Sequence, residues 1–225
     1  MNILGVMTKH WTPGLVKTRL AAERGEVWAS QIHKAFVECL LQRLQQTADQ
    51  RWLVFTPEGK RADFEQLVPS ADFRLVCQAT GHLGQRMQAY FEQAFAAGAD
   101  RVVLIGSDSP TLPLEWIDQA FHALQADDVV LGPAEDGGYY LVGARNSVPP
   151  IFGEMPYSSP QLWTATVDKL QAAHISFACL PTWYDVDETP NLQRLWQELA
   201  TDEPTEAACS ILKEKLHQLI NSPFA

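Results

Sequence analysis

Short apolar runs alternate with amphipathic segments along this chain, and that alternation limits the possible folds more than any other feature of the sequence. The runs are short and rich in β-branched residues, which predicts strands, while the segments between them repeat their apolar residues at helical spacing. Strand and helix alternating at least four times predicts an α/β domain with a mostly parallel, doubly wound sheet. The predicted strands cover 2–7, 52–55, 73–77, 101–105, 129–131 and 175–180.

The predicted helices fill the gaps between those strands. Ser159-Pro160 and Thr189-Pro190 are expected to open two of them, each as an N-cap followed by a first-turn proline. A last amphipathic helix at 203–220 is expected to pack over an edge of the sheet. The other helices are predicted at 27–47, at 62–67, from 83 and from 112. With no evident linker, residues 1–225 are expected to form a single domain.

The composition excludes several classes of protein. The net charge of −10 argues against nucleic acid as a partner, although local cations can still hold a nucleotide. No apolar run approaches the roughly 20 residues of a membrane span, and the first strand does not read as a signal peptide. The four cysteines form no Cys-x-x-Cys pair, which favours free thiols over a zinc site. We therefore expect a cytoplasmic protein with no membrane partner.

Charged residues gather directly after the predicted strands. Three cations follow the first strand, where nucleotide-binding α/β folds hold phosphates, and acids follow three later strands. The carboxyl ends of parallel strands meet at one rim of a sheet, so these groups are expected to face one cleft. Mg²⁺ prefers one or two carboxylates together with substrate phosphates, and the pattern therefore predicts a metal-dependent transferase that uses a nucleotide. The residues are Lys9, Lys17 and Arg19, then Asp108, Glu135, Asp136, Asp185 and Asp187.

Each of these segments also has a purely structural interpretation. Asp108 stands before Ser-Pro, a common turn sequence, and Asp136-Gly137 is a strong hairpin signal. The glycines at 81 and 84 are compatible with close approach to a flat ligand and equally with a plain turn. The cations after the first strand are compatible with a solvated basic loop.

Five motifs together resemble the GT-A-type nucleotide-diphospho-sugar transferase superfamily, and more closely an uncharacterised bacterial family labelled as glycosyltransferases. They are Lys17-Thr18-Arg19-Leu20, Leu83-Gly84-Gln85-Arg86-Met87, Gly106-Ser107-Asp108-Ser109-Pro110, the run from Gly132 to Gly143, and Asp185-Val186-Asp187. The first motif is also similar to the phosphate-gripping stretch of 2-phospholactate guanylyltransferases, and the molybdenum cofactor guanylyltransferases are related. The resemblance implies a Rossmann-like GT-A fold with helices on both faces of the sheet. It further implies a nucleotide-binding half at about 1–110 and an acceptor-binding half at about 111–200.

Taken with the residue pattern, the resemblance implies individual roles. Asp108 and Asp187 would hold Mg²⁺ or Mn²⁺, with Asp185 as an alternative second ligand. The candidate catalytic residues are Lys17, Arg19, Asp108 and Asp136, with the two cations on outer phosphate oxygens and Asp136 as the base. The candidate nucleotide-binding residues are Lys9, Lys17, Thr18, Arg19, Thr80, Gly81, Leu83, Gly84, Arg86 and Asp108. The candidate acceptor-binding residues are Glu135, Asp136, Gly137, Gly138, Tyr139 and Tyr140.

Two departures from related enzymes bear on the reaction. The first loop carries only Gly14 where many sugar nucleotidyltransferases are glycine-rich, and Ser107-Asp108-Ser109 replaces the Asp-x-Asp of metal-dependent glycosyltransferases. We expect nucleotidyl transfer, in which a small-molecule acceptor attacks the α-phosphate of a nucleoside triphosphate and pyrophosphate leaves. Glycosyl transfer from a nucleotide sugar is the first alternative. A nucleotide-binding module without chemistry and a purely structural α/β protein follow, and the sequence assigns no oligomeric state.

Overall fold

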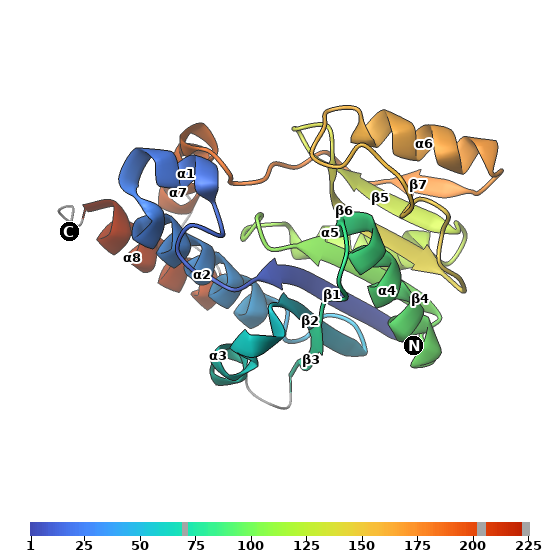
Figure 1. Ribbon diagram of the computed structural model, residues 1–225, viewed down its shortest axis with the longest axis horizontal. Helices are drawn as coiled ribbons and strands as arrows, with labels where there is room; N and C mark the ends of the chain where they lie inside the picture. Colours follow the sequence, from blue (N-terminus) through green and yellow to red (C-terminus); the bar gives the residue numbers. More distant parts are fainter. Residues whose placement is uncertain (69–71, 202–205, 222–225) are drawn as a thin grey trace.

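The computed structural model describes residues 1–68, 72–201 and 206–221, and within these ranges seven strands form one sheet (Figure 1). The strand order is β3-β2-β1-β4-β6-β5-β7, and β6 runs antiparallel to both its neighbours while the remaining pairs are parallel. The expected α/β fold with a mostly parallel sheet is therefore confirmed. The strands are β1 (Asn2–Lys9), β2 (Gln50–Thr56), β3 (Arg74–Cys77), β4 (Arg101–Gly106), β5 (Val129–Pro133), β6 (Tyr139–Arg145) and β7 (Phe177–Cys179).

Helices cover both faces of the sheet, as expected. Successive residues of a strand point to opposite faces, so Leu4 and Val6 of β1 belong to one apolar cluster and Ile3 belongs to another. Strands buried on both faces read as continuous apolar runs, which is why they were visible in the sequence. The first face is covered by α2 (Glu26–Arg43), α3 (Arg61–Leu67) and α5 (Leu114–Ala123), and the second by α4 (Leu83–Ala96) and α6 (Leu162–Ala172). A single 3₁₀ turn, η1 (Glu58–Lys60), precedes α3.

A third apolar cluster lies beyond the sheet, at one end of the molecule. There α1 (Thr18–Arg24), α7 (Thr189–Thr201) and α8 (Ala207–Asn221) gather around α2 (Figure 1). The expectation that the last helix packs over an edge of the sheet is wrong, because α2 has a second apolar side, with Ile32 and Phe36, that α7 and α8 cover. Residues 203–205 of the predicted helix lie outside the described residues.

One helix begins later than the sequence predicted, and one short helix was not predicted. The helix expected to open at Ser159-Pro160 begins at Leu162, because Leu162 first closes a turn by donating its amide to the carbonyl of Ser159 at 3.0 Å. The short helix α1 was not predicted, since Leu20 is the residue that it buries and a single apolar position leaves no periodic signal. No helix within the described ranges is long and apolar enough to cross a lipid bilayer.

Candidate functional site

A cavity of about 540 Å³ opens where β1 and β4 end. Because β6 is antiparallel, its first residues lie at the same rim as the last residues of β4, with Leu141 paired to Ile105. The first turn of α4 and the loops after β1, β4 and β5 complete the wall. The cavity therefore lies at the carboxyl rim of the parallel strands, the place where open α/β sheets bind ligands.

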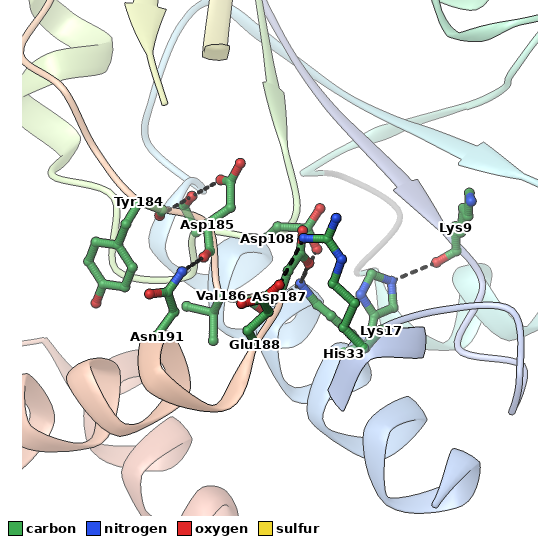
Figure 2. A network of polar contacts seen from close by, with 12 residues as sticks. Lys9, Lys17, His33, Asp108, Tyr184, Asp185, Val186, Asp187, Glu188 and Asn191 are labelled. Atoms are coloured by element: carbon green, nitrogen blue, oxygen red, sulfur yellow. Dashed lines mark hydrogen bonds and ion pairs between the residues drawn. The ribbon is translucent and has the colours of Figure 1, made fainter. Parts of the chain in front are cut away.

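Lys17 lies at the centre of the charged part of this cavity. It adopts a left-handed backbone conformation (φ 47°, ψ 44°) directly before α1, and its side chain is 1% exposed. The ammonium donates hydrogen bonds to Oδ1 of Asp108, to Oδ1 of Asp187 at 2.8 Å and to the carbonyl of Val186 at 2.8 Å (Figure 2). These bonds use all three of its protons.

The charges of this cluster stabilise one another. Burial opposes the charged form of Lys17, but Asp108 and Asp187 outweigh it and hold the pKa of the ammonium above its ordinary value. Burial likewise opposes ionisation of Asp108, yet Lys17 keeps the pKa of that carboxyl below its usual range. Lys17 is therefore a charged ammonium beside an ionised Asp108 at neutral pH.

The segment 185–187 is fastened to the end of β4 by bonds that do not involve Lys17. The amide of Val186 donates to the carbonyl of Asp108 at 2.9 Å, and the hydroxyl of Ser109 lies 2.6 Å from Oδ1 of Asp185. Asn191, on α7, donates its side-chain amide to the carbonyl of Asp185 at 2.7 Å. Burial, reinforced by the negative charge of Asp108, raises the pKa of Asp185 to about 7.

Two further cations lie on the cavity wall. Lys9 is exposed at the end of β1. Arg86, on the first turns of α4, donates from Nε to the carbonyl of Gly81 at 2.8 Å and from Nη1 to Oε1 of Gln78 at 3.4 Å. The side-chain amide of Gln78 in turn donates to the carbonyl of Thr8 at 2.8 Å. Gln78 therefore links the guanidinium of Arg86 to the end of β1.

The turn between β5 and β6 contributes a further acid, Asp136, to the cavity wall. Asp136 accepts a 2.9 Å hydrogen bond on Oδ1 from the amide of Gly138. Gly137 has φ of 90°, and a Cβ there would lie 2.5 Å from the carbonyl oxygen of Pro160. The turn is therefore a hairpin, as one interpretation predicted, and it also brings Asp136 and Tyr139 to the cavity wall, which keeps the site interpretation open as a prediction.

The two tyrosines at the start of β6 are placed differently. Tyr139 and Tyr140 both reach the cavity wall, but the Tyr140 hydroxyl donates to the carbonyl of Pro181 at 3.0 Å. The Tyr139 hydroxyl is buried and has no hydrogen-bond partner among the described residues. Burial raises the pKa of both phenols, so both are protonated at neutral pH.

Comparison with protein families decides where the chain belongs. A family model described as "Uncharacterized protein conserved in bacteria (DUF2064)" matches residues 39–159, which is more than half of the chain. The chain belongs to the DUF2064 family. A comparison with curated proteins found no match.

Solved structures share the fold of this chain. A family relative from Desulfovibrio desulfuricans G20, provisionally named a nucleotide-diphospho-sugar transferase, is 31% identical with a TM-score of 0.87, over 97% of this chain and 96% of its own. A cytidylyltransferase from Leptospira borgpetersenii is 11% identical with a TM-score of 0.60, over 100% and 98%. A nucleotidyl transferase from Methanothermobacter thermautotroptrophicus is 14% identical with a TM-score of 0.59, over 90% and 99%. The last two share the fold, and the expected resemblance to the GT-A-type superfamily is confirmed.

The cavity of this DUF2064 protein collects most of the residues predicted from sequence. The predicted residues that line it are Lys9, Lys17, Thr18, Leu83, Arg86, Asp108, Asp136, Gly138, Tyr139, Tyr140, Asp185 and Asp187. The predicted residues that lie away from its wall are Arg19, Thr80, Gly81, Gly84, Glu135 and Gly137.

Ion pairs and packing explain why three of these residues do not line the cavity. Arg19 lies on α1, which directs its side chain outward to Glu188 at 3.1 Å. Glu135 turns to Arg194 of α7 at 2.9 Å. Gly84 lets α4 approach the segment at 152–157, because a Cβ there would overlap the carbonyl of Phe152. Its small size therefore serves packing between elements in this structure.

Sequence reasoning missed His33 and Gln78. His33 is buried on α2 and lines the cavity, with Nε2 lying 3.0 Å from the carbonyl of Lys9. Burial lowers its pKa, with the positive charge of Lys17 adding to the effect against the opposing influence of Asp108. A histidine between Ile32 and Phe36 on an apolar helix face was the available signal. Gln78 gave no signal, because only the folded chain brings it to Thr8 and Arg86.

The carboxylates at this site supply part of the oxygen ligands that a hard divalent cation needs. Asp108 and Asp187 reach the cavity with side chains 39% and 45% exposed. Among the described residues, no group of three or more His, Cys, Asp or Glu side chains is arranged around a common point for a metal. Two carboxylates fit Mg²⁺ or Mn²⁺ when substrate phosphates supply further oxygens, which is the usual mode of Mg²⁺ binding at phosphate-transferring sites.

Proposed function

We propose that this DUF2064 protein is a nucleotidyltransferase. An acceptor oxygen attacks the α-phosphorus of a nucleoside triphosphate, the bond from that phosphorus to the bridging oxygen breaks, and pyrophosphate leaves. The observation that carries the proposal is the cluster of Lys17, Asp108 and Asp187 at the cavity rim, with Lys9 and Arg86 on the same wall. Cations and paired carboxylates facing one cavity match the needs of a triphosphate and its metal.

Relatives support the transferase class. The family relative from Desulfovibrio carries a transferase name, and the Leptospira and Methanothermobacter proteins that share the fold are named nucleotidyl-type transferases. Nucleotide-diphospho-sugar transferases and nucleotidyltransferases both use a nucleotide as substrate, so both names favour a transferase of that kind.

Each residue has a definite part in this proposal. Lys9 and Arg86 would hold outer phosphate oxygens, and Asp108 with Asp187 would hold Mg²⁺ or Mn²⁺. A bound metal of this kind would supply positive charge against the negative charge that develops on the leaving pyrophosphate. Asp136, in the turn between β5 and β6, would take the proton of the acceptor hydroxyl. Asp185 would stay outside the metal shell, since its Oδ1 lies against the hydroxyl of Ser109.

Glycosyl transfer is the second candidate, because the relative at 31% identity carries the name of a nucleotide-diphospho-sugar transferase. The same cations and carboxylates would then hold the diphosphate of a nucleotide sugar. The acceptor oxygen would attack the anomeric carbon, and a nucleoside diphosphate would leave in place of pyrophosphate.

Thermal unfolding with a panel of ligands tests these candidates. The panel contains nucleoside triphosphates, nucleoside diphosphates and nucleotide sugars, each with and without Mg²⁺. A ligand at about 100 times its dissociation constant adds roughly 2.7 kcal/mol of stability, which is a readable shift. We expect one triphosphate to stabilise the protein with metal, and to lose this effect in Asp108→Asn but not in Asp118→Asn, an exposed change on α5. Preference for a nucleotide sugar would favour glycosyl transfer, and no shift from any nucleotide would overturn both proposals.

Release of pyrophosphate separates an enzyme from a module that only binds. The stabilising triphosphate is incubated with a panel of small alcohols, phosphates and carboxylic acids, and pyrophosphate is measured. Turnover by the wild type that is lost in Asp108→Asn is the expected result. Tight binding with no turnover for any acceptor would favour a module without chemistry.

A further inference from the structure

The proposed metal site already contains a cation. The ammonium of Lys17 lies between Oδ1 of Asp108 and Oδ1 of Asp187, the two carboxylates that a divalent metal would share (Figure 2). The carbonyl of Val186 accepts its third proton at 2.8 Å. In this arrangement Lys17 has no proton left for a phosphate, and one oxygen of each carboxylate is occupied.

We propose that Lys17 is the resident counter-ion of the Asp108–Asp187 pair, and that the pair accepts a divalent cation only when Lys17 leaves it for the phosphates of a nucleotide. This inference rests on the proposed function and deepens it. Two cations cannot share the pair without strong repulsion in a partly buried site. Phosphate oxygens give the departing ammonium an equally anionic partner, so metal and nucleotide bind with positive coupling and each strengthens the other.

Lys17 is the partner that would move. The backbone bond from Val186 to Asp108 and the contact of Ser109 with Asp185 hold both acidic segments without help from Lys17. Lys17 instead carries its ammonium on a flexible four-carbon stem at the start of α1, and its side chain lines the same cavity as Lys9. The lysine therefore changes partners while the two carboxylates stay in place.

Binding of Mn²⁺ alone tests this inference without any nucleotide. Free Mn²⁺ is followed by electron paramagnetic resonance during titration of the wild type, of Lys17→Met, which keeps the aliphatic length, and of the matched control Lys60→Met. Lys60 directly precedes α3, pairs with Asp63 of that helix, and lies away from the cavity wall. We expect Lys17→Met to bind Mn²⁺ at least about tenfold more tightly than the wild type, and Lys60→Met to match the wild type. Equal or weaker binding by Lys17→Met would overturn the inference.

A second variant guards against loss of folding. Lys17→Gln removes the charge but keeps two donors for the carboxylates, and circular dichroism establishes that it is folded. Tighter Mn²⁺ binding by folded Lys17→Gln supports the inference, and unchanged binding overturns it. Failure of the proposed function is seen separately, as the absence of stabilisation by every nucleotide in wild-type protein.

Discussion

The backbone amide of Val186 donates a 2.9 Å hydrogen bond to the carbonyl of Asp108. This bond joins the segment before α7 to the carboxyl end of β4, so acids from distant parts of the sequence meet without a ligand. Because main-chain atoms make the link, replacing the Asp108 carboxylate leaves it in place. Side-chain variants of the site therefore keep this link, although they change the charges that stabilise one another around Lys17.

Replacement of Asp185 by Asn should change how stability depends on pH. Burial raises the pKa of Asp185 to about 7 in the folded protein, above its value in the unfolded chain. The folded state then binds this proton more tightly than the unfolded state, so the contribution of Asp185 to stability is full at low pH and is lost as the pH rises to about 7. Asp185→Asn keeps an oxygen for the Ser109 hydroxyl but cannot ionise.

Urea unfolding of the wild type and Asp185→Asn from pH 4 to pH 8, in metal-free buffer, measures this effect. The stability of the variant relative to the wild type should rise through the window between about pH 4 and about pH 7 and then level off. A difference that stays constant across the range would contradict the raised pKa.

Gly84→Ala should destabilise the fold. Alanine normally favours a helix over glycine by about 1 kcal/mol, but here the added methyl would overlap the carbonyl of Phe152 and the hydroxyl of Tyr157. Overpacking of this kind costs about 1–3 kcal/mol in free energy of unfolding, measured by urea titration. The matched control is Gly59→Ala, where a Cβ meets no atom of the described residues within 4 Å. Equal stability of the two variants would contradict the close packing of α4 against 152–157.

Arg43→Met should loosen the loop that follows Asp108. The buried guanidinium donates to the carbonyl of Pro110 at 2.8 Å and of Leu112 at 2.9 Å, and it pairs with Glu206 at 2.6 Å. Methionine leaves these carbonyls without a donor, which should cost about 1–3 kcal/mol in free energy of unfolding. Arg61→Met is the control, since it breaks an exposed pair with Glu58 and should change the stability little. A loss no greater than that of the control would show that water replaces the guanidinium.

Lys9→Met should weaken binding of a triphosphate without altering the fold. The side chain is exposed on the cavity wall, so its removal takes away charge near the phosphates and little packing. A hydrogen bond to a charged group contributes about 1.5–3 kcal/mol, so the dissociation constant should rise roughly tenfold to a hundredfold in calorimetry. Lys60→Met, which also removes one partly exposed cation, should bind as the wild type does. Comparable weakening in both variants would point to the overall charge of the protein in place of a specific contact.

The fold was largely predictable because its main signals are local. Strands buried on both faces appear as short apolar runs, and α2 and α4 repeat their apolar residues at helical spacing. The helix α1 escaped prediction because Leu20 is its one buried position. The amphipathic pattern of α8 showed that the helix has an apolar face, but not that α2 offers a second apolar side to receive it.

The candidate site was predictable where a residue lies in a segment that follows the carboxyl end of a strand. Lys17, Asp108 and Asp187 converge because β1, β4 and the segment after β7 deliver them to one rim, and strand ends are visible in the sequence. The position of the Arg19 side chain could not be predicted in this way. Its direction depends on the helical geometry of α1, which points it toward Glu188. The place of His33 follows from the packing of α2 against β1, which no local pattern contains.

Because β6 runs back between β4 and β5, the turn at 134–138 reaches the cavity while both of its strands are locked in the sheet. Substitutions and insertions in this turn can reshape the cavity wall without moving the ends of β1 and β4. Under the proposed function, changes in this turn would alter the acceptor side of the cavity while the charged cluster is retained. The charged cluster and the turn are therefore separable parts of the cavity, one built on strand ends and the other on a hairpin.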